Sequence, residues 1–175
     1  HRLAPTSTVA RRPSPRVPAG VGIGTIDPMP TTHLLYLHGF RSSPQSMKAQ
    51  KAAARVRVRN PDVTWWCPQL PPSPQKAMAM VMQGIAGWPR ASMAVMGSSL
   101  GGFYATWVAQ QAGCPAVLLN PAVDPARDLA AYIGEQTQFH HPEEHFYFEP
   151  AFVHELRALE TGEPESPEKI FAVIA

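Results

Sequence analysis

Cysteine is scarce in this chain: its 175 residues include only two, Cys67 and Cys114. They show neither the spacing of a metal site nor a disulfide framework, and each lies at or near the edge of an apolar run. We therefore expect free, buried thiols, which suit a reducing cytoplasm. Long apolar runs are missing as well. No stretch approaches the ~20 apolar residues that a helix needs to cross a bilayer, which excludes a membrane span.

Charge is also sparse, at 16% of residues with a net charge of +2. The positive excess comes from the first thirty residues, which hold four arginines and one aspartate. The rest of the chain holds 11 basic and 12 acidic residues and is almost neutral. Because nucleic-acid surfaces are strongly basic, this balance excludes a nucleic-acid partner from our expectations.

Residues 1–30 contain six prolines and few residues able to form a core. We expect a disordered or artefactual extension there. Two alternatives stay open. The Arg-rich, acid-poor composition is compatible with a transit peptide, and translation from Met29 would begin just before the first predicted strand.

From residue 33 onward, short apolar segments alternate with helical patterns. This predicts one α/β domain over residues 31–175, built around a parallel sheet that is buried on both faces. The predicted strands are 33–37, 63–67, 92–96, 116–120 and 169–175, and the predicted helices are 45–58, 75–87 and 99–111. The spacing of Met78, Met82 and Ile85 predicts a core-packing stripe. Two further helical stretches are expected within residues 125–160.

Between the third strand and the following helix, residues 96–102 read MGSSLGG. A Gly-x-Ser-x-Gly pattern in this context is typical of a nucleophile elbow, a strained turn that exposes a serine at the carboxyl edge of a sheet. Ser99 is the candidate nucleophile, and Gly97 and Gly101 allow the strand and helix to pass closely. Ser98 is a poorer candidate because no glycine stands two residues before it.

His38, Gly39 and Phe40 directly follow the first strand. In enzymes with such an elbow, this loop supplies one backbone N–H to the oxyanion hole, and the residue after the nucleophile supplies the other. Here the donors would be the N–H groups of Phe40 and Leu100. One such donor contributes ~3 kcal/mol to stabilising the transition state.

Four ordered blocks resemble the YqiA-like esterases, a small α/β-hydrolase family: LLYLHGFRSSP at 34–44, PQLPP at 68–72, GSSLGGFYAT at 97–106 and LNPAV at 119–123. The resemblance covers residues 33–175. It implies a three-layer α/β-hydrolase sandwich with a mostly parallel sheet and a lid at about 125–160. It also implies a serine esterase that hydrolyses carboxylic esters or thioesters through an acyl-enzyme, with no metal or organic cofactor. The implied partner is a small acyl ester or thioester, and the oligomeric state stays open.

The resemblance places the catalytic acid and histidine after the strand at 170–174, whereas the sequence ends at Ala175. We therefore expect a fold that is incomplete at its C-terminus and nearly inactive by itself, because a serine without a base is a weak nucleophile. The alternative is a catalytically incompetent fragment or a non-enzymatic binding relative. Substitute groups exist in the chain, but we interpret them as solvated lid residues: Asp124, Asp128, His140, His141, His145 and His154.

Two rival patterns carry less weight. Residues 141–145 match H-x-x-E-H, a zinc-peptidase pattern that requires a helix, but Pro142 disfavours one. Residues 97–102 lack the Gly-Lys-Ser/Thr ending of a phosphate-binding loop. Aromatic residues near the elbow and in the lid are candidates for an acyl pocket, with core packing as the alternative reading for Trp107: Phe103, Tyr104, Trp107, Phe139, Phe146, Tyr147 and Phe148.

Overall fold

Short apolar segments form the central sheet in a computed structural model that describes residues 30–174. The five strands are parallel and lie in the order β2-β1-β3-β4-β7. Their bounds are β1 His33–Leu37, β2 Thr64–Trp66, β3 Met93–Ser98, β4 Ala116–Leu119 and β7 Ile170–Val173. All five coincide with the predicted strands. The extension expected at 1–30 lies, apart from residue 30, outside the described residues.

Three helices cover the sheet and confirm the predicted ones: α1 Met47–Arg59, α2 Pro74–Gly84 and α3 Leu100–Ala112. Local chemistry sets where they begin. The Ser46 and Ser73 side chains accept hydrogen bonds from the first-turn amides of α1 and α2, and Pro74 occupies the first turn of α2, where its missing N–H costs nothing. The three-residue helices η1 Arg90–Ser92 and η3 Pro167–Lys169 precede β3 and β7.

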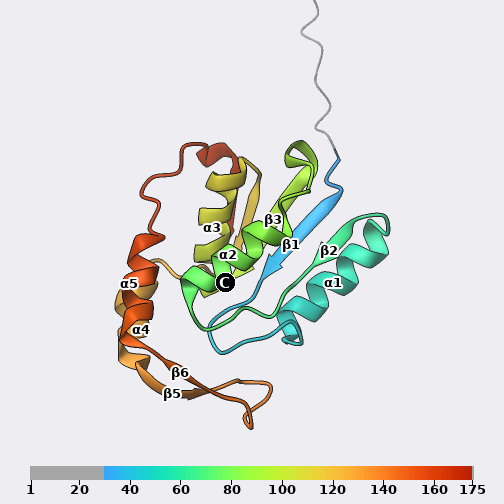
Figure 1. The fold of residues 1–175 in the computed structure, drawn as a ribbon. Coiled ribbons are helices and arrows are strands. Elements are labelled where there is room, and N and C mark those ends of the chain that lie inside the picture. Colours follow the sequence, from blue (N-terminus) through green and yellow to red (C-terminus); the bar gives the residue numbers. More distant parts are fainter. Residues whose placement is uncertain (1–29, 175) are drawn as a thin grey trace, which may run out of the picture.

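The strand order determines the layers. The crossover from β1 to β2 runs one way along the sheet and the crossovers from β2 to β3 and from β3 to β4 run the other way. Because such crossovers are right-handed, α1 covers one face while α2 and α3 cover the opposite face. Figure 1 shows α1 beside β2, apart from α3 and the later helices. This is a three-layer α/β arrangement.

The core lies between the sheet and α2 and α3. Leu35, Leu37 and Val95 of the strands are fully buried against Met78, Val81 and Ile85. Met78 is 2% exposed, and Met82 is half-buried against the same cluster, so the Met-rich stripe belongs to the core as predicted.

The two cysteines differ in how deeply they are buried. Both are free; Cys114 is buried, whereas Cys67 is half-buried, so the expectation of buried thiols holds fully for one of them.

Residues 125–160 form a further layer that packs on α2 through its last helix, and its buried Leu129, Phe148 and Leu156 belong to the same core cluster as the strands. Two predicted helices are present, α4 Pro125–Leu129 and α5 Pro150–Ala158, together with η2 Ala130–Tyr132. Between them lies an antiparallel hairpin that the sequence did not predict, β5 Gly134–Thr137 and β6 His145–Phe148. We call residues 134–148 the lid hairpin. Figure 1 shows it near the carboxyl ends of the sheet strands.

A carboxylate of α5 ties this layer to α2. Glu155 Oε2 accepts a hydrogen bond of 2.7 Å from the Ser73 hydroxyl and one of 3.0 Å from the Gln75 N–H. A carboxylate at the N-terminus of a helix satisfies unpaired amides and is stabilised by the helix dipole. These two hydrogen bonds attach α5 to the N-terminus of α2.

Among residues 30–174, no helix is long and apolar enough to cross a membrane.

Candidate functional site

Ser99 stands at the point where β3 ends and α3 begins, and its side chain is exposed at the carboxyl edge of the sheet. Its backbone has φ 55° and ψ −122°, a conformation that residues with a side chain rarely adopt. Hydrogen bonds hold this turn on both sides: the Ser99 N–H donates to Leu119 O at 3.1 Å, and the Ser99 carbonyl accepts from Ala122 N at 3.0 Å. The geometry agrees with the predicted elbow.

Glycines make the elbow sterically possible. A Cβ on Gly97 would overlap the Gly101 carbonyl, and a Cβ on Gly101 would overlap the Leu37 carbonyl of β1. A Cβ on Gly102 would stand 2.7 Å from Pro121 Cβ. The first turn of α3 therefore rests directly on the backbone of β1 and β3, which places its positive end beside Ser99.

The loop after β1 lies against the same serine. A Cβ built on Gly39 would be 3.2 Å from Ser99 Cβ and 3.7 Å from Ser99 Oγ. The next amide along the chain is that of Phe40, which makes no backbone hydrogen bond to another residue of 30–174. Leu100 begins α3, so its N–H is one of the helix's unpaired donors. The structure thus brings Ser99, Gly39, Phe40 and Leu100 together.

His38 cross-links this loop to the segment after β2. It is 4% exposed, and its Nε2 accepts a hydrogen bond of 3.1 Å from the Leu70 N–H. Nδ1 therefore carries the proton of the neutral ring and donates to Gly39 O at 3.0 Å. Burial lowers the pKa of His38, and the hydrogen bond to Gly39 opposes that shift only in part. The neutral ring keeps both loops in place.

Arg41 connects the same loop to the lid hairpin, and sequence reasoning did not single it out. Its Nε donates to Thr137 O at 2.7 Å, and its Nη2 donates to Thr137 Oγ1 at 3.0 Å. Its guanidinium lies 4.4 Å from the centre of the Phe139 ring, and its carbonyl accepts from Phe139 N at 2.8 Å. Arg41 adopts a left-handed φ of 56°, which no sequence signal indicated.

The Phe40 ring packs edge-on against aromatic rings of the lid. Its ring centre lies 5.6 Å from that of Tyr132, 6.0 Å from Phe146 and 5.2 Å from Phe148. These ring contacts with residues 132–148 help to fix the position of Phe40 and of its backbone N–H. Trp107 instead packs against the core, as the alternative reading held.

Two cavities meet at Ser99, and Phe40 and Phe139 line both of them. The larger, of about 600 Å³, extends under α4 and has a mixed lining, to which Arg41, Asn120 and Asp128 contribute polar groups. Its apolar lining residues are Phe40, Leu100, Ala122, Pro125, Leu129, Tyr132 and Phe139. The smaller, of about 320 Å³, extends from Ser99 to the start of α1. We call them the α4 cavity and the α1 cavity.

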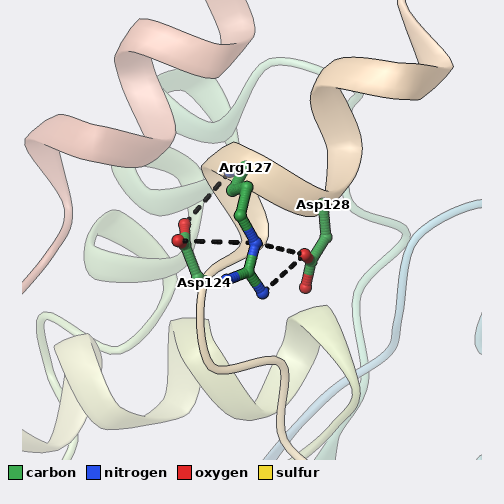
Figure 2. A network of polar contacts seen from close by, with 3 residues as sticks. All are labelled: Asp124, Arg127 and Asp128. Atoms are coloured by element: carbon green, nitrogen blue, oxygen red, sulfur yellow. Dashed lines mark hydrogen bonds and ion pairs between the residues drawn. The ribbon is translucent and has the colours of Figure 1, made fainter.

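Asp124 and Asp128, the alternative acids of the sequence analysis, are paired with an arginine (Figure 2). Arg127 lies 3.8 Å from Asp124 and 2.9 Å from Asp128, and Asp124 also caps α4 by accepting from the Arg127 N–H. All three side chains are substantially exposed. Neither carboxylate is hydrogen-bonded to a histidine in the described part of the chain.

The zinc-peptidase pattern is contradicted by the structure. Residues 141–144 form a turn and His145 begins β6, so the two histidines do not share a helical face. His141 lies 3.3 Å from Glu143 and His145 lies 3.3 Å from Glu135. No cluster of metal-ligating side chains occurs within residues 30–174. Pro142 breaks the helix that the pattern needs.

No histidine or carboxylate of residues 30–174 makes a hydrogen bond to Ser99 Oγ. His140 lines the α1 cavity with Ser99 and is exposed, whereas His154 lies on the exposed side of α5. Within the described residues, the exposed Ser99 thus lies beside the Gly39 loop and the first turn of α3, and no histidine or carboxylate is hydrogen-bonded to its hydroxyl.

Comparison with known proteins gives both a family and a fold. The model of the uncharacterised protein family UPF0227 matches residues 33–174. Alpha/beta hydrolase domain-containing protein 10 from mouse has a similar structure, with a TM-score of 0.57 and 12% identity over 82% of this chain and 79% of that one. Est1E from Butyrivibrio proteoclasticus, solved with ferulic acid, gives a TM-score of 0.58 and 11% identity over 83% and 80%. These likenesses confirm the three-layer α/β-hydrolase fold with its mostly parallel sheet.

Proposed function

Since the chain belongs to the protein family UPF0227, the YqiA-like esterases, we propose that it is a serine esterase whose nucleophile is Ser99. One observation carries the proposal: an exposed serine held at φ 55° and ψ −122° between a parallel strand and a helix, facing the Gly39 loop. Such strain costs of order 1–3 kcal/mol and is retained where it serves function.

The reaction follows from the placement of three groups. Ser99 Oγ attacks the carbonyl carbon of an ester or thioester, and the carbonyl oxygen becomes an oxyanion that accepts hydrogen bonds from the Phe40 and Leu100 N–H groups. The C–O or C–S bond then breaks, and the alcohol or thiol leaves with a proton. Water then attacks the carbonyl carbon of the acyl–Ser99 ester, and the oxyanion of this second tetrahedral intermediate accepts hydrogen bonds from the same two N–H groups. The bond to Ser99 Oγ breaks, the carboxylic acid leaves and Ser99 regains its proton. No metal or organic cofactor enters these steps.

The proton that Ser99 loses needs an acceptor. The family resemblance places the acid and histidine after the strand equivalent to β7, outside the described residues. Residues 30–174 therefore supply nucleophile and oxyanion donors, and we expect the 175-residue chain to acylate slowly without an added base. The α4 cavity, of about 600 Å³, is large enough to hold an acyl chain, with Leu100, Leu129 and Tyr132 among its apolar lining residues.

Acylation of Ser99 tests the proposal directly. The full chain is mixed with 4-nitrophenyl butyrate, with and without added imidazole as a replacement base, and the intact protein is weighed by mass spectrometry. We expect one butyryl group on Ser99, formed faster with imidazole. Ser98→Ala should retain this adduct and Ser99→Ala should lose it, because Ser98 is buried beside the nucleophile.

Three results bear on the alternatives. An adduct that persists in Ser99→Ala refutes the assignment of the nucleophile. Absence of any adduct with imidazole favours the incompetent or non-enzymatic reading. Rapid turnover without imidazole that disappears in Ser99→Ala would contradict the expected dependence on an added base.

A further inference from the structure

Charge is divided unevenly between two parts of the molecule, although residues 30–174 are almost neutral in sum. Residues 30–123 hold eight basic residues and one acidic residue, Asp62, which gives them a net charge of +7. Residues 124–174 hold three basic and eleven acidic residues, which gives them a net charge of −8. Figure 1 shows α1 on one side of the molecule and α4 and α5 on the other.

Helix α1 carries most of the positive charge. It holds five basic residues and no acidic one, and all five are exposed: Lys48, Lys51, Arg55, Arg57 and Arg59. None of them forms an ion pair or a side-chain hydrogen bond with Asp62 or with any other residue of 30–174. The helix dipole accounts only for Arg57 and Arg59, which stand in the last turn. The other three lower the stability of α1, because like charges three or four positions apart repel one another.

Four of these side chains form a row along one side of α1. The cationic row consists of Lys48, Lys51, Arg55 and Arg59. Successive members are three, four and four positions apart, which keeps them on the same side of the helix over ~16 Å. Met47 and Val58 adjoin the row, since they stand four positions before Lys51 and three after Arg55. They are apolar, yet 67% and 83% exposed.

We propose that α1 docks on a membrane surface that contains anionic lipids, with the cationic row against the lipid phosphates and carboxylates. A cluster of unpaired basic residues on a helix is typical of such binding. Met47 and Val58 favour lipid over a nucleic acid or a small anion, because they can enter between the headgroups. The negative charge of residues 124–174 sets the orientation, since an anionic surface repels that side of the molecule.

Docking through α1 also positions the cavity that reaches Ser99. Ser46, Met47 and Lys48 at the start of α1 line the α1 cavity together with Ser99. A chain bound through the cationic row would therefore hold this cavity close to the lipid surface. Binding itself does not involve Ser99, so its test is independent of the proposed function.

Sedimentation of the full chain with lipid vesicles tests the inference. One set of vesicles is phosphatidylcholine alone, and in the other about a third of the lipid is phosphatidylserine. We expect binding to the mixed vesicles only, and its loss when NaCl is raised from ~0.1 M to ~1 M, because salt screens exposed charges. Lys51→Gln combined with Arg55→Gln removes the middle of the row and keeps good helix-forming residues. It should weaken binding roughly 25-fold, about fivefold for each charge.

Lys76→Gln combined with Arg157→Gln is the matched control, because it removes two exposed charges from α2 and α5 and leaves α1 intact. It should bind as the parent chain does. Equal binding of the parent to both kinds of vesicle overturns the inference without any substitution. Unchanged binding of the α1 variant also overturns it, and assigns the attraction to other cations, such as the arginines of residues 1–30. Binding to soluble polyglutamate but not to the mixed vesicles overturns it in favour of an acidic protein partner.

Discussion

Replacing Ser99 by glycine should stabilise the protein while removing the proposed nucleophile. The φ of 55° and ψ of −122° at Ser99 cost a residue with a Cβ of order 1–3 kcal/mol, and glycine avoids that cost. Glycine also loses more backbone entropy on folding, by roughly 0.5–1 kcal/mol. The exposed hydroxyl makes no hydrogen bond to another described residue, so its removal contributes little. The net gain is about 1 kcal/mol.

Ser99→Ala is the matched control, since alanine keeps the Cβ and with it the strain. Urea unfolding should give Ser99→Gly a midpoint higher than that of Ser99→Ala by about 0.5 M, at an unchanged slope. The reasoning is refuted if the two variants unfold at the same midpoint, or if Ser99→Gly is the less stable of the two.

Three further outcomes follow from contacts around the site. In Arg41→Ala the lid hairpin loses two charge-assisted hydrogen bonds to Thr137, so exchange of hairpin amides should accelerate about 30-fold, corresponding to about 2 kcal/mol; unchanged exchange would contradict the clamp. Burial lowers the pKa of His38 below its ordinary value of 6.5, so at mildly acidic pH the unfolded chain binds a proton at His38 while the folded chain does not. The free energy of unfolding should therefore fall as the pH drops below about 6.5. His38→Gln, measured by urea unfolding across the same pH range, should lack that part of the fall, and an identical pH dependence would contradict the assignment. Burial raises the pKa of the Cys67 thiol to about 11, so iodoacetamide at pH 8 should modify Cys67 of the folded chain about 100-fold more slowly than a free thiol of pKa 9.0, and equal rates would contradict its burial.

The sheet and the elbow were predictable because their signals are local. Each strand is a short apolar run between turn residues. The ends of such a run therefore predict the first and last residue of the strand to within one to three positions. Ser99 was recognisable because Gly97 and Gly101 leave room that no larger residue would, and the close contacts with the Gly101 and Leu37 carbonyls confirm that steric requirement.

The lid hairpin was not predictable for the opposite reason. Its strands are polar on one side, and they pair only with each other, so no neighbouring strand of the sheet fixes their register. The side chain that holds the hairpin is that of Arg41, 96 residues from Thr137 in the sequence. A positive φ at an arginine leaves no mark in the sequence. The H-x-x-E-H pattern could be discounted from the sequence because Pro142 disfavours a helix, and the turn at residues 142–143 agrees with that argument.

The contact between Glu155 and the start of α2 also bears on how the chain folds. Ser73 and Glu155 are 82 residues apart, so the Gln75 N–H at the start of α2, unlike the Lys76 N–H that Ser73 caps, waits for a partner that is synthesised much later. Closing a loop of that length carries an entropy cost that local capping does not. α5 should therefore dock on α2 late in folding, after β1, β3 and β4 have paired. The sheet that carries Ser99 would then form before residues 125–160 pack against it.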